Sequence, residues 1–183
     1  MSRISEQALA RAINKVHGMS RQEKETLVDS LYRKQPAMLA SLIVQKRLGV
    51  SLEKMEFLLN ILLICFQAMK ESGIHWPAIT EDDQDRQAAR YEGVMNFGRD
   101  LTPSLGAQSL AKYVQSHPEA ILYAYVFKET TDWLARVSPA EESDKYVVMA
   151  AANFVDCIAH VQLPKGAQSA DANFLQKHNT AVG

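Results

Sequence analysis

The sequence lacks the features that mark secreted and membrane-spanning chains. Its 183 residues include two cysteines, Cys65 and Cys157, too few for the disulfide framework of a small secreted domain. Its first residues contain no hydrophobic signal core. Its longest apolar run, residues 57–66, has ten residues, whereas a membrane span needs about 20. We therefore expect a cytoplasmic protein with no membrane segment.

Strand-like patterns are also missing. No segment shows sustained alternation of apolar and polar residues with β-branched side chains, so a sheet is not expected. Helix signals are frequent instead: Ser-x-x-Glu capping boxes begin at Ser20, Ser116 and Ser138, and glycines at 18, 49 and 73 stand where helices should end. The helices predicted from these signals cover residues 4–17, 21–34, 37–48, 52–72, 81–100, 104–115, 118–136 and 139–162.

Two of these helices, 52–72 and 139–162, are apolar around most of their circumference. A helix of this kind must be covered on several sides, so both helices should be central. The fold class that follows is all-α: an irregular bundle of about eight helices around these two, forming one domain over residues 1–163. Residues 164–183 have few apolar anchors, and we expect them to form a flexible tail. The side chains predicted to be buried are Leu58, Leu62, Ile64, Val148, Ala151, Phe154 and Val155.

The sequence has no excess of positive or negative charge. Its net charge is −1, which argues against a polyanion-binding protein as a whole. The distribution is uneven, however: residues 1–50 carry nine Lys and Arg against four Asp and Glu, a net charge of +5. Residues 47–51 have the form of a helix-turn-helix turn, but the next helix begins with Glu53 and Glu56 rather than with base-reading side chains. Nucleic-acid binding by the basic N-terminal helices is therefore the weaker alternative.

The usual metal-binding patterns are absent too. Neither Glu-x-x-His nor His-x-x-x-His occurs, so no metal and no cofactor are expected. The best polar constellation is Asn153, Asp156 and His160, which share one face of the last central helix. A carboxylate one turn from an imidazole orients the ring and raises its basicity, as catalysis requires. A pocket there would use these three residues and Asp132. The competing interpretation is that they form the solvent-exposed edge of a buried helix.

Two apolar features are candidates for an interface or a lid. The connection 73–79 is rich in large apolar residues for a loop, and helix 118–136 adds several aromatic side chains. Aromatic residues at helical spacing also occur in ordinary cores, which is the competing interpretation. The candidate interface or lid residues are Ile74, His75, Trp76, Tyr125 and Trp133.

No catalytic residue can be identified from these patterns. We therefore predict a helical binding or regulatory protein that acts through protein–protein contacts. The excess of apolar helix surface and the near-zero net charge favour a two-fold homodimer. The alternative is an enzyme or small-molecule receptor with a pocket between the central helices, lined by Asn153, Asp156 and His160.

Overall fold

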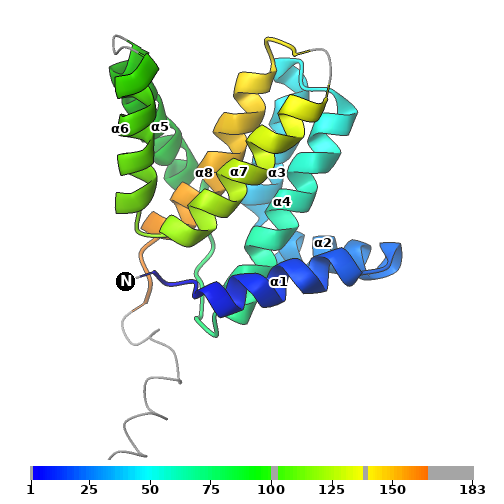
Figure 1. Cartoon of the computed structure of the whole chain (residues 1–183). Helices are drawn as coiled ribbons and strands as arrows, with labels where there is room; N and C mark the ends of the chain where they lie inside the picture. Colours follow the sequence, from blue (N-terminus) through cyan, green and yellow to red (C-terminus); the bar gives the residue numbers. More distant parts are fainter. Residues whose placement is uncertain (1, 100–102, 138–139, 165–183) are drawn as a thin grey trace, which may run out of the picture.

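The computed structural model describes residues 2–99, 103–137 and 140–164 (Figure 1). Over these ranges the chain forms helices and no strand, so the prediction of an all-α bundle is confirmed. The helices are α1 Glu6–Gly18, α2 Arg21–Lys34, α3 Pro36–Val44, the short 3-10 helix η1 Gln45–Leu48, α4 Leu52–Glu71, α5 Glu81–Arg99, α6 Pro103–Ser116, α7 Ala120–Arg136 and α8 Asp144–His160. No helix in the described ranges is long and apolar enough to cross a membrane. The predicted tail lies almost entirely outside the described residues.

Side-chain caps begin several helices where the sequence predicts them. Ser20 accepts a hydrogen bond from the amide of Glu23, whose carboxylate accepts one from the amide of Ser20. Ser51 caps α4 by accepting from the amide of Lys54. Gly49 ends η1 with a φ of 83°, a left-handed conformation that a residue with a Cβ rarely adopts. Local signals thus fix the boundaries in the first third of the chain.

The other two predicted capping boxes have different outcomes. Ser116 is the last residue of α6, and its hydroxyl donates to the carbonyl of Tyr113, so the predicted box of Ser116 and Glu119 is wrong. The carboxylate of Glu119 instead accepts hydrogen bonds from the backbone amides of Arg3 and Ile4. Ser138 lies outside the described residues, and the helix predicted to begin at residue 139 begins at Asp144.

Residues 2–4 form an N-terminal arm that joins the start of α7 to the end of α8. The buried carboxylate of Glu119 accepts hydrogen bonds from the amides of Arg3 and Ile4, at 2.7 and 3.1 Å. The guanidinium of Arg3 donates to the carbonyls of Ile158 and Val161, at 3.1 and 2.8 Å. The carbonyls in the last turn of a helix receive no hydrogen bond from the helix itself, and the guanidinium of Arg3 donates to one of them, that of Ile158.

The two predicted central helices, α4 and α8, lie at the centre of the bundle. α4 packs against α1, α3 and α8, while α8 also packs against α5 and α7 (Figure 1). Six of the seven predicted core side chains are at most 2% exposed. Val148 is the exception: it lies where α8 faces α7 and stays half-buried. Burial on both central helices therefore follows the sequence closely.

One charged side chain is buried where α4 meets the start of α8. The side chain of Lys54 is only 3% exposed, and its ammonium donates to the carboxylates of Glu141, at 2.7 Å, and Asp144. Burial alone would lower the pKa of Lys54, but these two hydrogen bonds and charges raise it above its ordinary value. The lysine therefore stays charged and ties the two central helices together.

Candidate functional site

Polar side chains from α5, α6, α7 and α8 converge near the end of α8. At the centre is Asp156, which is 1% exposed. Its Oδ1 accepts a hydrogen bond from Nε2 of His117 at 2.9 Å and a longer one from the hydroxyl of Tyr113 at 3.3 Å. The ring of Tyr123 lies against His117, with 4.6 Å between the ring centroids. Together with His160 and Arg90, these side chains form the Asp156 cluster.

Hydrogen bonds assign the protonation of His117. The amide of Glu119 donates to Nδ1 of His117 at 3.1 Å, so Nδ1 is an acceptor and carries no proton. The ring proton is therefore on Nε2, from which it is donated to Asp156. The contact between His117 and Asp156 is thus a neutral imidazole bound to a carboxylate, and not an ion pair.

His160 has the opposite tautomer. Its Nδ1 lies 2.8 Å from the backbone carbonyl of Asp156, which can only accept, so Nδ1 carries the proton. Its Nε2 faces the guanidinium of Arg90, which can only donate. Burial, and then the charge of Arg90, lower the pKa of His160 below its ordinary value of 6.5. The imidazole is therefore neutral near pH 7, with its Nε2 lone pair directed at Arg90.

Two buried oxygen atoms of the cluster are unsatisfied. Oδ2 of Asp156 and the hydroxyl of Tyr123 have no hydrogen-bond partner among the described residues. Burial, and then the charge of Asp156, raise the pKa of Tyr113 to about 12, so this phenol stays protonated. The same causes raise the pKa of the Cys157 thiol to about 12, which excludes a thiolate beside the cluster at neutral pH.

The structure brings together only part of the predicted polar set. Asp156 and His160 meet in the cluster, and Asp156 is buried rather than on a solvent-exposed edge, whereas Asn153 and His160 are half-buried. The amide of Asn153 contacts the sulfur of Cys157 at 3.8 Å rather than the cluster. Asp132 is exposed on α7, where it pairs with Lys128. These two residues lie outside the Asp156 cluster.

The sequence prediction missed His117, Tyr113, Tyr123 and Arg90. Each comes from a different element than α8, and no spacing rule links them to Asp156. One local signal was available: His117 stands before a proline, at a break between helices, where a polar ring can turn inward. The cluster as a whole depends on how the helices pack.

A cavity of about 590 Å³ reaches the cluster from the surface. It lies between the start of α5 and the residues that follow α8, and His160 is part of its wall. Its lining residues are Pro77, Ala78, Asp83, Arg86, Gln87, His160, Val161 and Gln162. The cavity gives small solutes a route to the half-buried imidazole.

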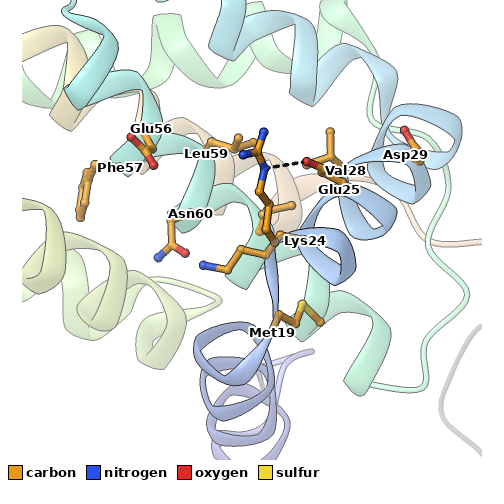
Figure 2. Close-up of a pocket in the computed structure, with 11 residues that line it drawn as sticks. Met19, Lys24, Glu25, Val28, Asp29, Glu56, Phe57, Leu59 and Asn60 are labelled. Carbon is orange, nitrogen blue, oxygen red and sulfur yellow. Dashed lines mark hydrogen bonds and ion pairs between the residues drawn. The ribbon is translucent and has the colours of Figure 1, made fainter.

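A second, larger hollow is formed by other helices, α2 and α4. This groove, of about 750 Å³, runs between α2 and α4 (Figure 2). Its apolar lining is Met19, Val28, Phe57, Leu59 and Leu63, and its polar lining is Arg21, Lys24, Glu25, Asp29, Glu56 and Asn60. Arg21 and Glu25 pair at 3.0 Å, and in Figure 2 the ammonium of Lys24 extends from α2 toward Asn60. The side chains of Lys24, Asp29 and Glu56 have no ion-pair partner within the described ranges.

The apolar surface continues beyond the groove. Leu52 is 72% exposed and belongs to the same stripe of α4 as Leu59 and Leu63, because residues 52, 59 and 63 recur at helical spacing. Tyr32, 65% exposed, continues the stripe of α2 that contains Val28. Large apolar side chains are thus exposed along both walls of the groove.

The predicted interface and lid residues divide between these regions. The ring of Trp133 stacks on Phe57, with 4.4 Å between centroids, so it borders the groove. Trp76 packs down and donates from its indole nitrogen to the carbonyl of Met69 at 2.9 Å. Ile74 and His75 lie on the wall of a separate hollow beside α4, and Tyr125 is half-buried against the core. Of the five, only Trp133 is tied to the groove.

Comparison with known proteins finds no match: no family model, no curated protein and no solved structure resembles this chain. The geometry of the Asp156 cluster and of the groove is therefore the basis for functional inference.

Proposed function

We propose that this chain is a helical binding protein that acts through protein–protein contacts, and that the groove between α2 and α4 seats a second copy of the chain. One observation carries the proposal. The groove has apolar lining residues and charges of both signs, Lys24 against Asp29 and Glu56, which have no ion-pair partner among the residues that the structure describes. An exposed apolar surface rimmed by polar residues is typical of an interaction site.

The mixed charges favour self-association over a partner of one sign. A two-fold interface uses the same patch on both copies, so the patch must complement itself. Lys24 of one protomer can then pair with Asp29 or Glu56 of its partner, and the reverse contact follows by symmetry. The net charge of −1 adds little repulsion between copies.

The apolar stripes supply the area that such an interface needs. A stable interface buries about 800 Å² on each partner, more than a groove of this size offers by itself. Leu52 and Tyr32 extend the apolar surface along both walls, and the stack of Phe57 on Trp133 borders it with a rigid aromatic pair. Rigid aromatic side chains bind at low entropic cost and are common at the centres of interfaces.

Light scattering and sedimentation of the purified chain test the proposal. At micromolar concentration the mass should rise toward twice 20.4 kDa. Lys24→Glu and Glu56→Lys should each weaken the dimer, and mixing the two variants should restore it, because each supplies the charge that the other lacks. Lys112→Glu is the matched control: it makes the same charge change at an exposed position on α6.

Two results would contradict the proposal. A mass that stays at 20.4 kDa at every concentration would refute self-association and leave the groove to a helix of another protein. A dimer that the Lys24 and Glu56 variants leave intact would place the interface on a different surface.

The alternative function, a receptor or enzyme for a small molecule, is favoured by the Asp156 cluster and by the cavity beside His160. A small molecule bound there should raise the melting temperature of the chain in a fluorescence screen. The same compound should have no such effect on the His160→Gln variant.

A further inference from the structure

We infer that His117, Asp156 and His160 bind one divalent transition-metal ion of the first row. One ligating atom from each of the three residues lies within 4.8 Å of those of the other two. The histidine rings are also near each other, with centroids 5.9 Å apart. Metal–ligand bonds of about 2.0–2.2 Å require the three atoms to lie close around one point, and a small inward movement achieves this.

The ligand types select the class of ion. Two imidazoles and one carboxylate are the donor set of catalytic zinc sites with an open position and of non-haem Fe²⁺ sites. Soft ions that need several thiolates are a poor fit, because none of the three ligating atoms is a sulfur. Zn²⁺ and Fe²⁺ are therefore the ions that this set fits.

The unsatisfied carboxylate oxygen of Asp156 independently favours a cation ligand at this place. Asp156 is 1% exposed, yet its Oδ2 has no hydrogen-bond donor among the described residues. A buried carboxylate oxygen without a partner is destabilising, and a cation would satisfy it. The hydroxyl of Tyr123, whose ring packs against His117, also has no hydrogen-bond partner among the described residues.

His160 is already oriented as a metal ligand. Its Nδ1 donates to the carbonyl of Asp156, the kind of second hydrogen bond that fixes the ring of a ligating histidine. Nε2 is then the atom left to coordinate. The guanidinium of Arg90 now lies against that atom, and Arg90 is an exposed side chain that can swing away. Arg90 thus acts as a competing cation in the metal-free protein.

His117 must change tautomer to join the site. In the metal-free state its proton is on Nε2 and is donated to Asp156. Coordination through Nε2 moves this proton to Nδ1, and the amide of Glu119 then loses its acceptor there. His117 lies in the connection between α6 and α7, where such a local shift does not disturb a helix.

This inference departs from the sequence-based expectation of no metal. That expectation rested on motifs within one helix, and the third ligand lies 39 positions from Asp156 in another element.

The test is a calorimetric titration of metal-free protein with Zn²⁺, together with the visible absorption of the Co²⁺ form. We expect one ion per chain, with absorption bands typical of four- or five-coordinate Co²⁺. Asp156→Asn and His160→Gln should each weaken Zn²⁺ binding at least about tenfold. His75→Gln removes an exposed histidine outside the cluster and should leave binding unchanged.

The Arg90→Gln variant separates this site from adventitious binding to surface histidines. Removal of the competing guanidinium should tighten Zn²⁺ binding several-fold, an effect that a purely structural role of the cluster does not predict. Circular dichroism checks that each variant is folded, and if Asp156→Asn is not, His160→Gln and Arg90→Gln decide. The inference is overturned if the wild type shows no saturable binding, if His160→Gln binds like the wild type, or if Arg90→Gln does not bind more tightly.

Discussion

Replacement of Leu62 by alanine tests the assignment of α4 as a central helix. Leu62 has no exposed surface and is covered on all sides. The change removes three carbon atoms, whose burial contributes about 2.4 kcal/mol at about 0.8 kcal/mol each. A residual void of about 50 Å³ adds about 1.2 kcal/mol at about 24 cal/mol per Å³. The free energy of unfolding should therefore fall by about 3–4 kcal/mol.

Leu52→Ala is the matched control, because it makes the same change in the same helix at a position that is 72% exposed. Its effect should stay within about 0.5 kcal/mol. Denaturant unfolding followed by tryptophan fluorescence measures both variants, at submicromolar concentration so that self-association does not contribute. A loss below about 0.5 kcal/mol for Leu62→Ala would refute the central position of α4. Equal losses for both variants would show that burial does not govern the effect.

Three further changes probe polar contacts. Lys54→Met should lower the melting temperature by a few degrees, since it removes the buried ammonium between α4 and α8. Burial alone would raise the pKa of Asp144, but the hydrogen bond from Lys54 holds it below 3.8, so this contribution to stability is present above about pH 4 and lost as the pH falls further. Acid unfolding of the Lys54→Met variant should therefore depend less steeply on pH. Gln35→Ala should cost about 2–3 kcal/mol, because Gln35 is buried and its amide holds two backbone groups of the connection 73–79, each at 2.8 Å. Glu119→Ala should release the N-terminal arm, which hydrogen exchange of the amides of residues 3 and 4 would detect as faster exchange.

The helices were predictable because their signals are local. The capping box at Ser20 and the glycine at 49 act within one turn, and the observed bounds of α2 match the predicted range 21–34. The box predicted at Ser116 failed for a non-local reason. The carboxylate of Glu119 binds amides 115 and 116 positions away, an interaction that no local pattern encodes.

In the candidate sites, too, the features set by local spacing were predictable and those set by helix packing were not. The spacing of Asp156 and His160 within one helix placed them on one face, as the structure shows. Their burial, and the third side chain from His117, depend on how α6 and α7 pack on α8. The groove is formed where α2 crosses α4, and a sequence pattern gives the apolar faces of both helices without giving their crossing. Sequence reasoning thus found two of the six side chains of the Asp156 cluster, and the apolar character of the α4 wall of the groove, but not the groove itself.

The N-terminal arm also sets an order of events during protein synthesis. Ile4 ends 1% exposed, yet the carboxylate that anchors its amide is made 115 residues later, and the carbonyl of Ile158 that Arg3 binds follows Arg3 by 155 residues. At about 5–20 residues per second, the arm waits about 8–30 s on the ribosome before it can close. The complete set of contacts, to Glu119 and to the end of α8, is therefore a late folding event that requires a complete α8. A chain that stops short of α8 lacks the two carbonyls that the guanidinium of Arg3 binds, so only the hydrogen bonds to Glu119 can hold the arm.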